Sequence, residues 1–125
     1  MWIEDAMPPE NPDAMAFVRR QSPVPICTGE NLYTRQGFLR LIELQGCDGV
    51  RIDIPKSGGL LESKRISDLA DNYYIWTAAH NPASPVGTIA SAHAAAHTSR
   101  PARRGGHEAA QSGARSFASS PLVIR

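Results

Sequence analysis

The chain has 125 residues and a formal net charge of +1, which allows one small domain but is short for a complete enzyme with a large buried pocket. Residues 1–97 are mildly acidic, with 8 Lys/Arg and 11 Asp/Glu, whereas residues 98–125 carry five arginines and one glutamate. No run approaches the roughly 18 apolar residues of a membrane span, and acids stand at the N-terminus where a signal peptide needs basic residues. We therefore expect a cytoplasmic protein with no membrane partner.

The two cysteines, Cys27 and Cys47, are far apart in the sequence and lack the CxxC spacing of metal and redox sites. Such residues are most often small buried thiols in a reducing compartment. We expect no disulfide framework.

The first two apolar runs are each followed by turn residues and then by a helical pattern. MWIEDA (residues 1–6) predicts a strand, and Asn-Pro-Asp opens a helix over residues 11–20 that ends on two arginines. VPICTGE (24–30) predicts a second strand. A second helix follows, which Thr34 can cap and Gly46 ends.

The next two runs repeat this order. GVRIDI (49–54) predicts a third strand, and the Gly58-Gly59 turn leads into a helix with one apolar stripe. YYIWTAAH (73–80) predicts a fourth strand, after which Ser84-Pro85 can open an alanine-rich helix over 86–97.

Four strand-helix units in strict alternation predict an α/β fold, with a parallel sheet and helices outside it. The units begin near four isoleucines at spacings of 23, 26 and 23 residues, namely Ile3, Ile26, Ile52 and Ile75.

One ionisable residue stands where each predicted strand ends: Glu4, Glu30, Asp53 and His80. Catalytic groups of parallel α/β folds, and of (β/α)8 barrels above all, collect at the carboxyl ends of the strands. Any one of these residues alone is more often a solvated loop residue or a cap than a functional group. Four in register with the repeat favour a functional site.

Four stretches carry a family resemblance: WIED (2–5), PICTGENLYTRQGF (25–38), DIPKSGG (53–59) and AAHNPASPVG (78–87). Over residues 1 to about 97 the chain resembles the second half of the barrel domain of the enolase superfamily, in the mandelate racemase subgroup. It is most similar to acid-sugar dehydratases of the galactonate dehydratase type. The resemblance implies a partial (β/α)8 TIM barrel of about four βα units.

The resemblance also implies roles for the residues at the strand ends. Glu4 and Glu30 resemble two of the three carboxylates that hold Mg²⁺. Asp53 and His80, 27 residues apart, resemble the dyad in which the histidine is the general base. The muconate cycloisomerase and dipeptide epimerase relatives have a lysine base at the strand end that Asp53 occupies here, so this residue favours the racemase and dehydratase side.

Two further residues follow Glu30 closely. Asn31 and Arg35 could touch substrate, although a capping or surface role is equally compatible with the sequence. His93 and His97 are four apart on a predicted helix, but the glutamate of an HExxH zinc motif is absent, so we discount a zinc site.

The implied chemistry suits these residue types. Removing a proton alpha to a carboxylate crowds negative charge on one group, and a hard divalent cation with oxygen ligands offsets it. A histidine titrates near neutral pH and can take the proton, while a carboxylate on its other nitrogen fixes the tautomer. The resemblance therefore implies a small-molecule sugar acid as substrate and Mg²⁺ as cofactor.

Parts of the family's site have no counterpart in the chain, among them the first metal ligand and the capping domain. Residues 98–125 have no hydrophobic period and predict a disordered or frame-shifted tail. Five arginines with few aromatics make a weak case for a nucleic-acid arm, and we expect no nucleic-acid partner.

Two hypotheses of different class follow. The chain is the catalytic half of a Mg²⁺-dependent acid-sugar dehydratase, or of a racemase or epimerase of the same superfamily, and is active only when the missing half is supplied by another polypeptide or by self-association of half barrels. Alternatively, it is a non-catalytic truncated remnant. In either case the exposed edges of a partial barrel predict possible self-association.

Overall fold

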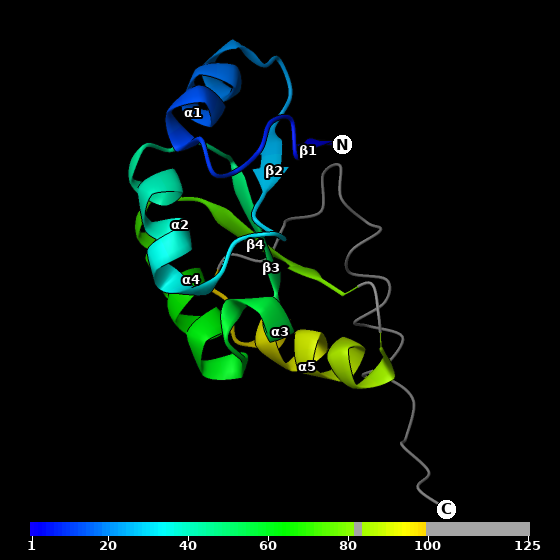
Figure 1. The fold of residues 1–125 in the computed structure, drawn as a ribbon. Helices are drawn as coiled ribbons and strands as arrows, with labels where there is room; N and C mark the ends of the chain where they lie inside the picture. Colours follow the sequence, from blue (N-terminus) through cyan, green and yellow to red (C-terminus); the bar gives the residue numbers. More distant parts are fainter. Residues whose placement is uncertain (82–83, 100–125) are drawn as a thin grey trace, which may run out of the picture.

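The structure, a computed structural model, describes residues 1–81 and 84–99, and confirms an α/β fold with a parallel sheet (Figure 1). Four strands lie in the order β1-β2-β3-β4, and all three pairs are parallel. The strands are β1 (Ile3–Glu4), β2 (Ile26–Thr28), β3 (Gly49–Asp53) and β4 (Trp76–His80). The helices are α1 (Pro12–Gln21), α2 (Thr34–Glu43), α3 (Ile54–Ser57), α4 (Leu60–Asn72) and α5 (Pro85–Ala96).

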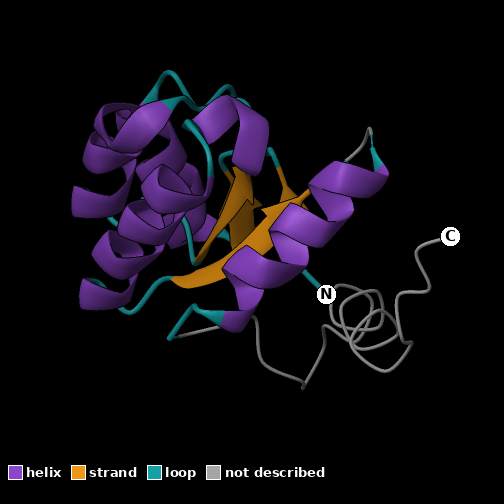
Figure 2. Cartoon of the chain, turned by 90° about the horizontal axis from the view of Figure 1, so that it is seen from below, coloured by secondary structure: helices purple, strands orange, loops and turns teal. Residues whose placement is uncertain are grey.

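The hydrophobic core lies between one face of the sheet and the helices, most of which gather on one side of the strands (Figure 2). Alternate residues of β3, Val50 and Ile52, point to this side and are at most 2% exposed. Burying side chains of this size contributes about 1.5–3 kcal/mol each relative to exposure. Helices and strands supply the rest of the core: Met15, Ile26, Leu32, Phe38, Leu41, Ile42, Cys47, Ile66, Ala70 and Ile75.

The opposite face of the sheet carries a pair of tryptophans near the amino ends of the strands. The rings of Trp2 and Trp76 have centroids 5.1 Å apart and are tilted by 45°. The Trp76 ring also covers Gly49 on β3, where a Cβ atom would lie 2.4 Å from it. A larger residue at Gly49 would therefore displace the ring.

Two helices begin as the sequence predicts. The side chain of Asn11 accepts from the backbone N–H of Ala14 at 3.1 Å, and that of Ser84 accepts from Gly87 at 2.9 Å. A proline stands in the first turn of both helices. These caps fix α1 and α5 at the expected positions.

Three local expectations were wrong. The fourth strand begins at Trp76 rather than Tyr73, because Tyr73 is the C-cap of α4. Thr34 does not cap the second helix, because α2 begins at Thr34 itself and its N–H at Arg35 donates to Glu62 on α4 instead. The third strand ends at Asp53 rather than Ile54, because Asp53 caps a short helix, α3, whose first turn contains Pro55.

Both cysteines are buried free thiols in the core, as expected. Burial raises the pKa of Cys27, and it raises that of Cys47 to about 12, so both thiols are protonated at neutral pH.

No helix within the described ranges is long and apolar enough to cross a bilayer. The tail prediction falls almost wholly on residues 100–125, which lie outside the described residues.

Candidate active site

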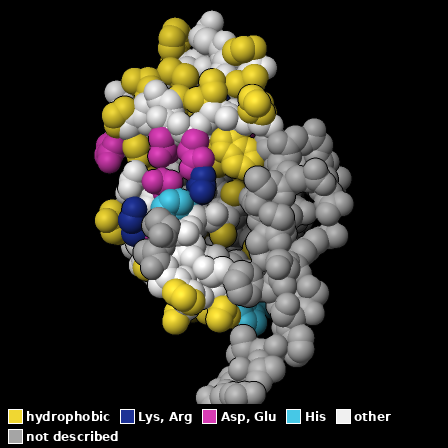
Figure 3. Space-filling view, turned by 90° about the vertical axis from the view of Figure 1, so that its right-hand side faces the viewer, with side chains coloured by type: hydrophobic (Ala, Val, Ile, Leu, Met, Phe, Trp, Pro, Cys, Tyr) yellow, Lys and Arg dark blue, Asp and Glu magenta, His cyan; other side chains and the backbone are white. Residues whose placement is uncertain are grey.

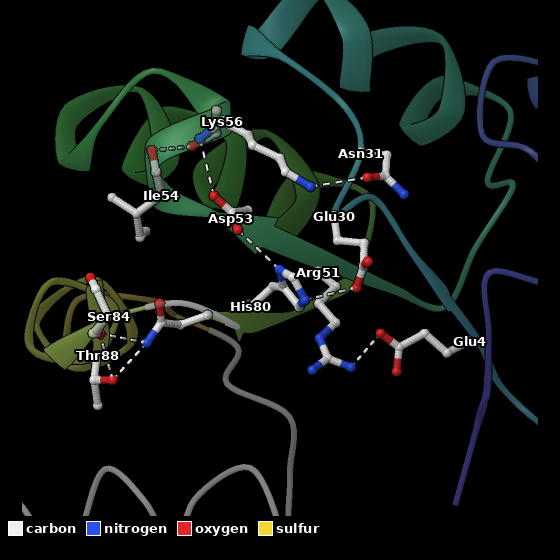
Figure 4. A network of polar contacts seen from close by, with 12 residues as sticks. Glu4, Glu30, Asn31, Arg51, Asp53, Ile54, Lys56, His80, Ser84 and Thr88 are labelled. Carbon is white, nitrogen blue, oxygen red and sulfur yellow. Dashed lines mark hydrogen bonds and ion pairs between the residues drawn. The ribbon is translucent and has the colours of Figure 1, made fainter. Parts of the chain in front are cut away.

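The four predicted residues lie together at the carboxyl ends of the strands. Glu4, Asp53 and His80 are the last residues of β1, β3 and β4, and Glu30 stands two residues after β2. Their side chains lie in one row across the carboxyl ends of the strands, with Arg51 among them (Figure 4).

Asp53 and His80 form a hydrogen-bonded pair. They are direct partners in the β3-β4 register, and His80 Nδ1 lies 3.0 Å from Asp53 Oδ2. The other oxygen of Asp53 accepts from the backbone N–H of Lys56 at 3.0 Å, which is the cap of α3. The carboxylate is therefore fixed on both sides, with only 6% of the side chain exposed, and it orients the imidazole.

Glu30 reaches the other nitrogen of the same ring, with its Oε2 atom 3.1 Å from His80 Nε2. The turn that aims it contains Gly29, whose φ of +127° suits glycine, and a Cβ there would lie 2.7 Å from the Phe38 ring. Carboxylates only accept, so both contacts are hydrogen bonds at once only when the ring is protonated. His80 is thus bracketed by two carboxylates in a nearly buried position, with 13% of its side chain exposed.

Glu4 has different partners. It forms an ion pair with Arg51 Nη1, and its second oxygen accepts from Trp2 Nε1 at 3.3 Å. Sequence reasoning missed Arg51. The signal was its position two residues before Asp53 in a strand, which places both side chains on the same face.

Asn31 lies at the rim of this cluster. It is exposed, and its Oδ1 atom accepts from Lys56 Nζ at 3.0 Å. Lys56 therefore contacts an amide in the loop after β2, and a substrate role for Asn31 stays a prediction.

Arg35 instead pairs with α4. Its Nε and backbone N–H groups donate to Glu62 Oε1 at 2.8 and 3.0 Å. These hydrogen bonds hold the pKa of Glu62 below its usual range. A substrate role for Arg35 would require this pair to open, and it also stays a prediction.

The oxygen donors suit a hard cation. Within the described residues no three His, Cys, Asp or Glu side chains are grouped as metal ligands. Glu4 and Glu30 nevertheless offer two carboxylates from neighbouring strand ends, and Mg²⁺ is commonly held by one or two carboxylates together with waters and substrate oxygens. The donor set therefore fits Mg²⁺ as a partial ligand set.

Acidic, basic and histidine side chains gather on one face of the molecule, next to hydrophobic side chains (Figure 3). Within this cluster Glu4 forms an ion pair with Arg51, and Glu30 lies against the imidazole of His80, which carries a charge only when it is protonated. The site can thus hold a proton between carboxylates and presents oxygen atoms to a cation.

Known proteins match this chain along its whole length or most of it. The family model described as enolase C-terminal domain-like matches residues 1–125. The D-xylonate dehydratase of Haloferax volcanii is 47% identical over 95 residues, which cover 76% of this chain and 23% of that protein. The D-galactonate dehydratase family member RspA of Halomonas elongata is 33% identical, covering 74% and 23%.

Solved structures give the same result. A mandelate racemase/muconate lactonizing enzyme-like protein from Rubrobacter xylanophilus is 51% identical with a TM-score of 0.77, covering 81% of this chain and 26% of that one. A mandelate racemase/muconate lactonizing enzyme from Sulfitobacter is 32% identical with a TM-score of 0.78, over 81% and 26%. The chain thus spans about a quarter of the length of these relatives.

Proposed function

Because the chain belongs to the enolase C-terminal domain-like family, we propose that it carries the general base of a Mg²⁺-dependent acid-sugar dehydratase. The observation that supports this most directly is the 3.0 Å contact between His80 Nδ1 and Asp53 Oδ2 at the carboxyl ends of adjacent strands. The relative at 47% identity is named a D-xylonate dehydratase, and the relative at 33% identity is named a member of the D-galactonate dehydratase family.

His80 would take the proton alpha to the substrate carboxylate on Nε2, the nitrogen that Asp53 leaves free. Asp53 holds the Nδ1–H tautomer and stabilises the imidazolium that results. The C–H electron pair moves into the carboxylate. The electron pair then returns to form a double bond between the alpha and beta carbons as the β-hydroxyl leaves with a proton, which the protonated His80 can return. One water is lost, and the resulting enol tautomerises to the 2-keto-3-deoxy acid.

Glu4 and Glu30 would hold Mg²⁺, which when bound offsets the negative charge that builds on the substrate carboxylate. Glu30 touches His80 Nε2 at 3.1 Å in the structure, so a Glu30 that turns to a cation leaves this nitrogen available as a base. Asn31 at the rim, and Arg35 if released from Glu62, are the candidate contacts for substrate hydroxyl groups.

The test is dehydration of D-xylonate and D-galactonate by the purified chain with Mg²⁺, measured as formation of the 2-keto-3-deoxy acid. We expect product to form at concentrations at which the chain self-associates, and to fall by roughly 100- to 10,000-fold in His80→Asn, the range that general-base catalysis contributes. His93→Asn is the control, because His93 is an exposed histidine on α5. Equal rates in His80→Asn and the unchanged chain would refute the assignment of the base.

A second candidate is a non-catalytic remnant of a mandelate racemase-like protein. It is favoured by the finding that the described residues supply two carboxylates, both engaged by Arg51 or His80. Absence of turnover together with absence of sugar-acid binding would favour the remnant. Inversion of the alpha carbon without loss of water would indicate a racemase or epimerase instead.

A further inference from the structure

Arg51 and Glu4 join two strands that are not neighbours. Arg51 projects from β3 across β2 and pairs through Nη1 with Oε1 of Glu4 at the end of β1. The side chains are only 28% and 30% exposed, so the pair is partly shielded from water. This guanidinium therefore neutralises one of the two carboxylates offered to a metal.

The environment of Glu4 leaves no oxygen without a donor. Arg51 takes one oxygen and Trp2 Nε1 donates to the other at 3.3 Å. Figure 4 shows the guanidinium beside the carboxylate of Glu4, on the side that faces His80. A cation that binds both carboxylates must displace it.

Arg51 is nonetheless held incompletely. Its Nε atom is buried without a hydrogen-bond partner among the described residues. Displacing the guanidinium from Glu4 costs one ion pair, and its Nε–H gains the chance of a partner in a new position. The unsatisfied Nε–H therefore lowers the cost of moving the guanidinium away from Glu4.

We infer, on the basis of the proposed function, that Arg51 is an internal counter-cation that competes with the divalent ion for Glu4 and so sets the metal affinity of the site. With no divalent ion bound, Arg51 stabilises the edge formed by β1. When the ion binds, it takes Glu4 and Glu30, and Arg51 turns away from Glu4.

The test is calorimetric titration of the full chain with MgCl₂, comparing it with Arg51→Gln. We expect Mg²⁺ to bind Arg51→Gln about fivefold more tightly, because a partly exposed ion pair opposes binding only modestly. Arg51→Lys keeps the charge and should stay near the unchanged chain. The control is Arg40→Gln, which removes an equal charge from an exposed pair with Asp13, 3.8 Å apart, and should change nothing.

A second measurement is independent of calorimetry. Without Mg²⁺, Arg51→Gln should unfold at a lower temperature than the unchanged chain, and saturating Mg²⁺ should raise its melting temperature by more. The double variant Arg51→Gln/Glu4→Gln should lose the gain in affinity, because the contested carboxylate is gone.

The outcomes separate this inference from the proposed function. Binding by the unchanged chain with equal or weaker binding by Arg51→Gln overturns the inference and leaves the metal role of Glu4 and Glu30 intact. Absence of Mg²⁺ binding in every variant overturns both. Tighter binding by Arg40→Gln as well would trace the effect to net charge and would also overturn the inference.

Discussion

His80 is held at both ring nitrogens, and the two contacts differ in what fixes them. Asp53 is bound by the cap of α3 as well as by the ring, whereas Glu30 is placed by a glycine turn and, among the residues that the structure describes, its carboxylate contacts the ring alone. The Asp53 contact is therefore the stable one, and the Glu30 contact is the one that can open. This asymmetry fits an orienting residue on Nδ1 and a reactive atom at Nε2.

The pair of Arg35 and Glu62 predicts a pH effect on stability. Hydrogen bonds from the side chain and backbone of Arg35 lower the folded-state pKa of Glu62. A depressed carboxyl pKa stabilises the fold above the ordinary glutamate value, and this contribution is lost as pH falls through the folded-state pKa. Glu62→Gln should therefore be less stable than the unchanged chain at neutral pH, with the gap closing in acid.

Urea unfolding midpoints at a series of pH values measure this effect. Glu43→Gln is the matched control, because Glu43 is an exposed residue of α2. It should show no gap that depends on pH in the acid range. A constant gap for Glu62→Gln from neutral pH down to about pH 3, below the ordinary carboxyl range, would contradict the account.

The sequence was sufficient to identify the four residues at the strand ends, because their residue types and spacing follow the repeat of strand-helix units. The pairing of His80 with Asp53 was expected from the resemblance and is found in the structure. The Glu30 and Arg51 contacts were not foreseen. Glu30 depends on a backbone turn at Gly29, and Arg51 spans three strands, so neither follows from a local pattern.

The helices differ in how firmly they are packed. Core residues of α2 and α4 include Phe38, Leu41 and Ile66, whereas the buried residues of α5 are Gly87 and Ser91. α5 begins at Pro85, five residues after His80 at the end of β4, and packs against that strand next to the site. The stability of α5 therefore depends on the packing of small residues and on the hydrogen bond of its N-cap.

We expect the same substitution to have opposite effects on stability at two serines, Ser91 within α5 and Ser84 at its N-cap. Ser91 Oγ is buried without a hydrogen-bond partner among the described residues, so Ser91→Ala should raise the free energy of unfolding by about 1 kcal/mol. Ser84 caps the helix through the N–H of Gly87, so Ser84→Ala should lower it by about 1 kcal/mol. Urea unfolding of both variants measures the difference, and a loss of equal size in both would refute this reading of Ser91.

Predictions of elements succeeded where local signals are strong. The Asn-Pro-Asp and Ser-Pro starts fixed α1 and α5 because caps act within one turn. The predicted start of α2 was wrong because the backbone N–H of Arg35 donates to Glu62, which is 27 residues away in the sequence. α3 was missed because four residues are too few for a periodic signal, although Asp-Ile-Pro is a capped start.

The whole molecule is a partial barrel with two strands at the edges of the sheet. Among the described residues β1 and β4 each pair on one side only. Unpaired strand edges favour association with further strands. We expect the chain to self-associate as its concentration rises.

Light scattering across a concentration series tests this expectation. Ile3→Lys places a charge on β1, where Ile3 is 43% exposed, and should shift the chain toward the monomer. Leu61→Lys is the control, because Leu61 is a 65% exposed residue of the helix α4 and is not part of an edge strand. A monomer at all concentrations, or an equal effect of both variants, would contradict the role of the edge.

The order of the four strands was predictable because regular alternation of strands and helices leaves few arrangements of a parallel sheet. How the chain acts as a whole was not, because its relatives are about four times as long. The side chains at the carboxyl ends of its strands nevertheless include the hydrogen-bonded pair of Asp53 and His80.

We propose that His80, oriented by Asp53, removes the proton alpha to the carboxylate of a sugar acid. The decisive measurement is to incubate the chain with D-xylonate and Mg²⁺ in D₂O, at a concentration at which it self-associates, and to follow loss of the alpha-proton signal by NMR. We predict loss of this signal, at a rate roughly 100-fold or more lower in His80→Asn and also reduced in Asp53→Asn. Loss at the same rate in His80→Asn as in the unchanged chain, or no loss with any sugar acid that binds, would contradict the claim.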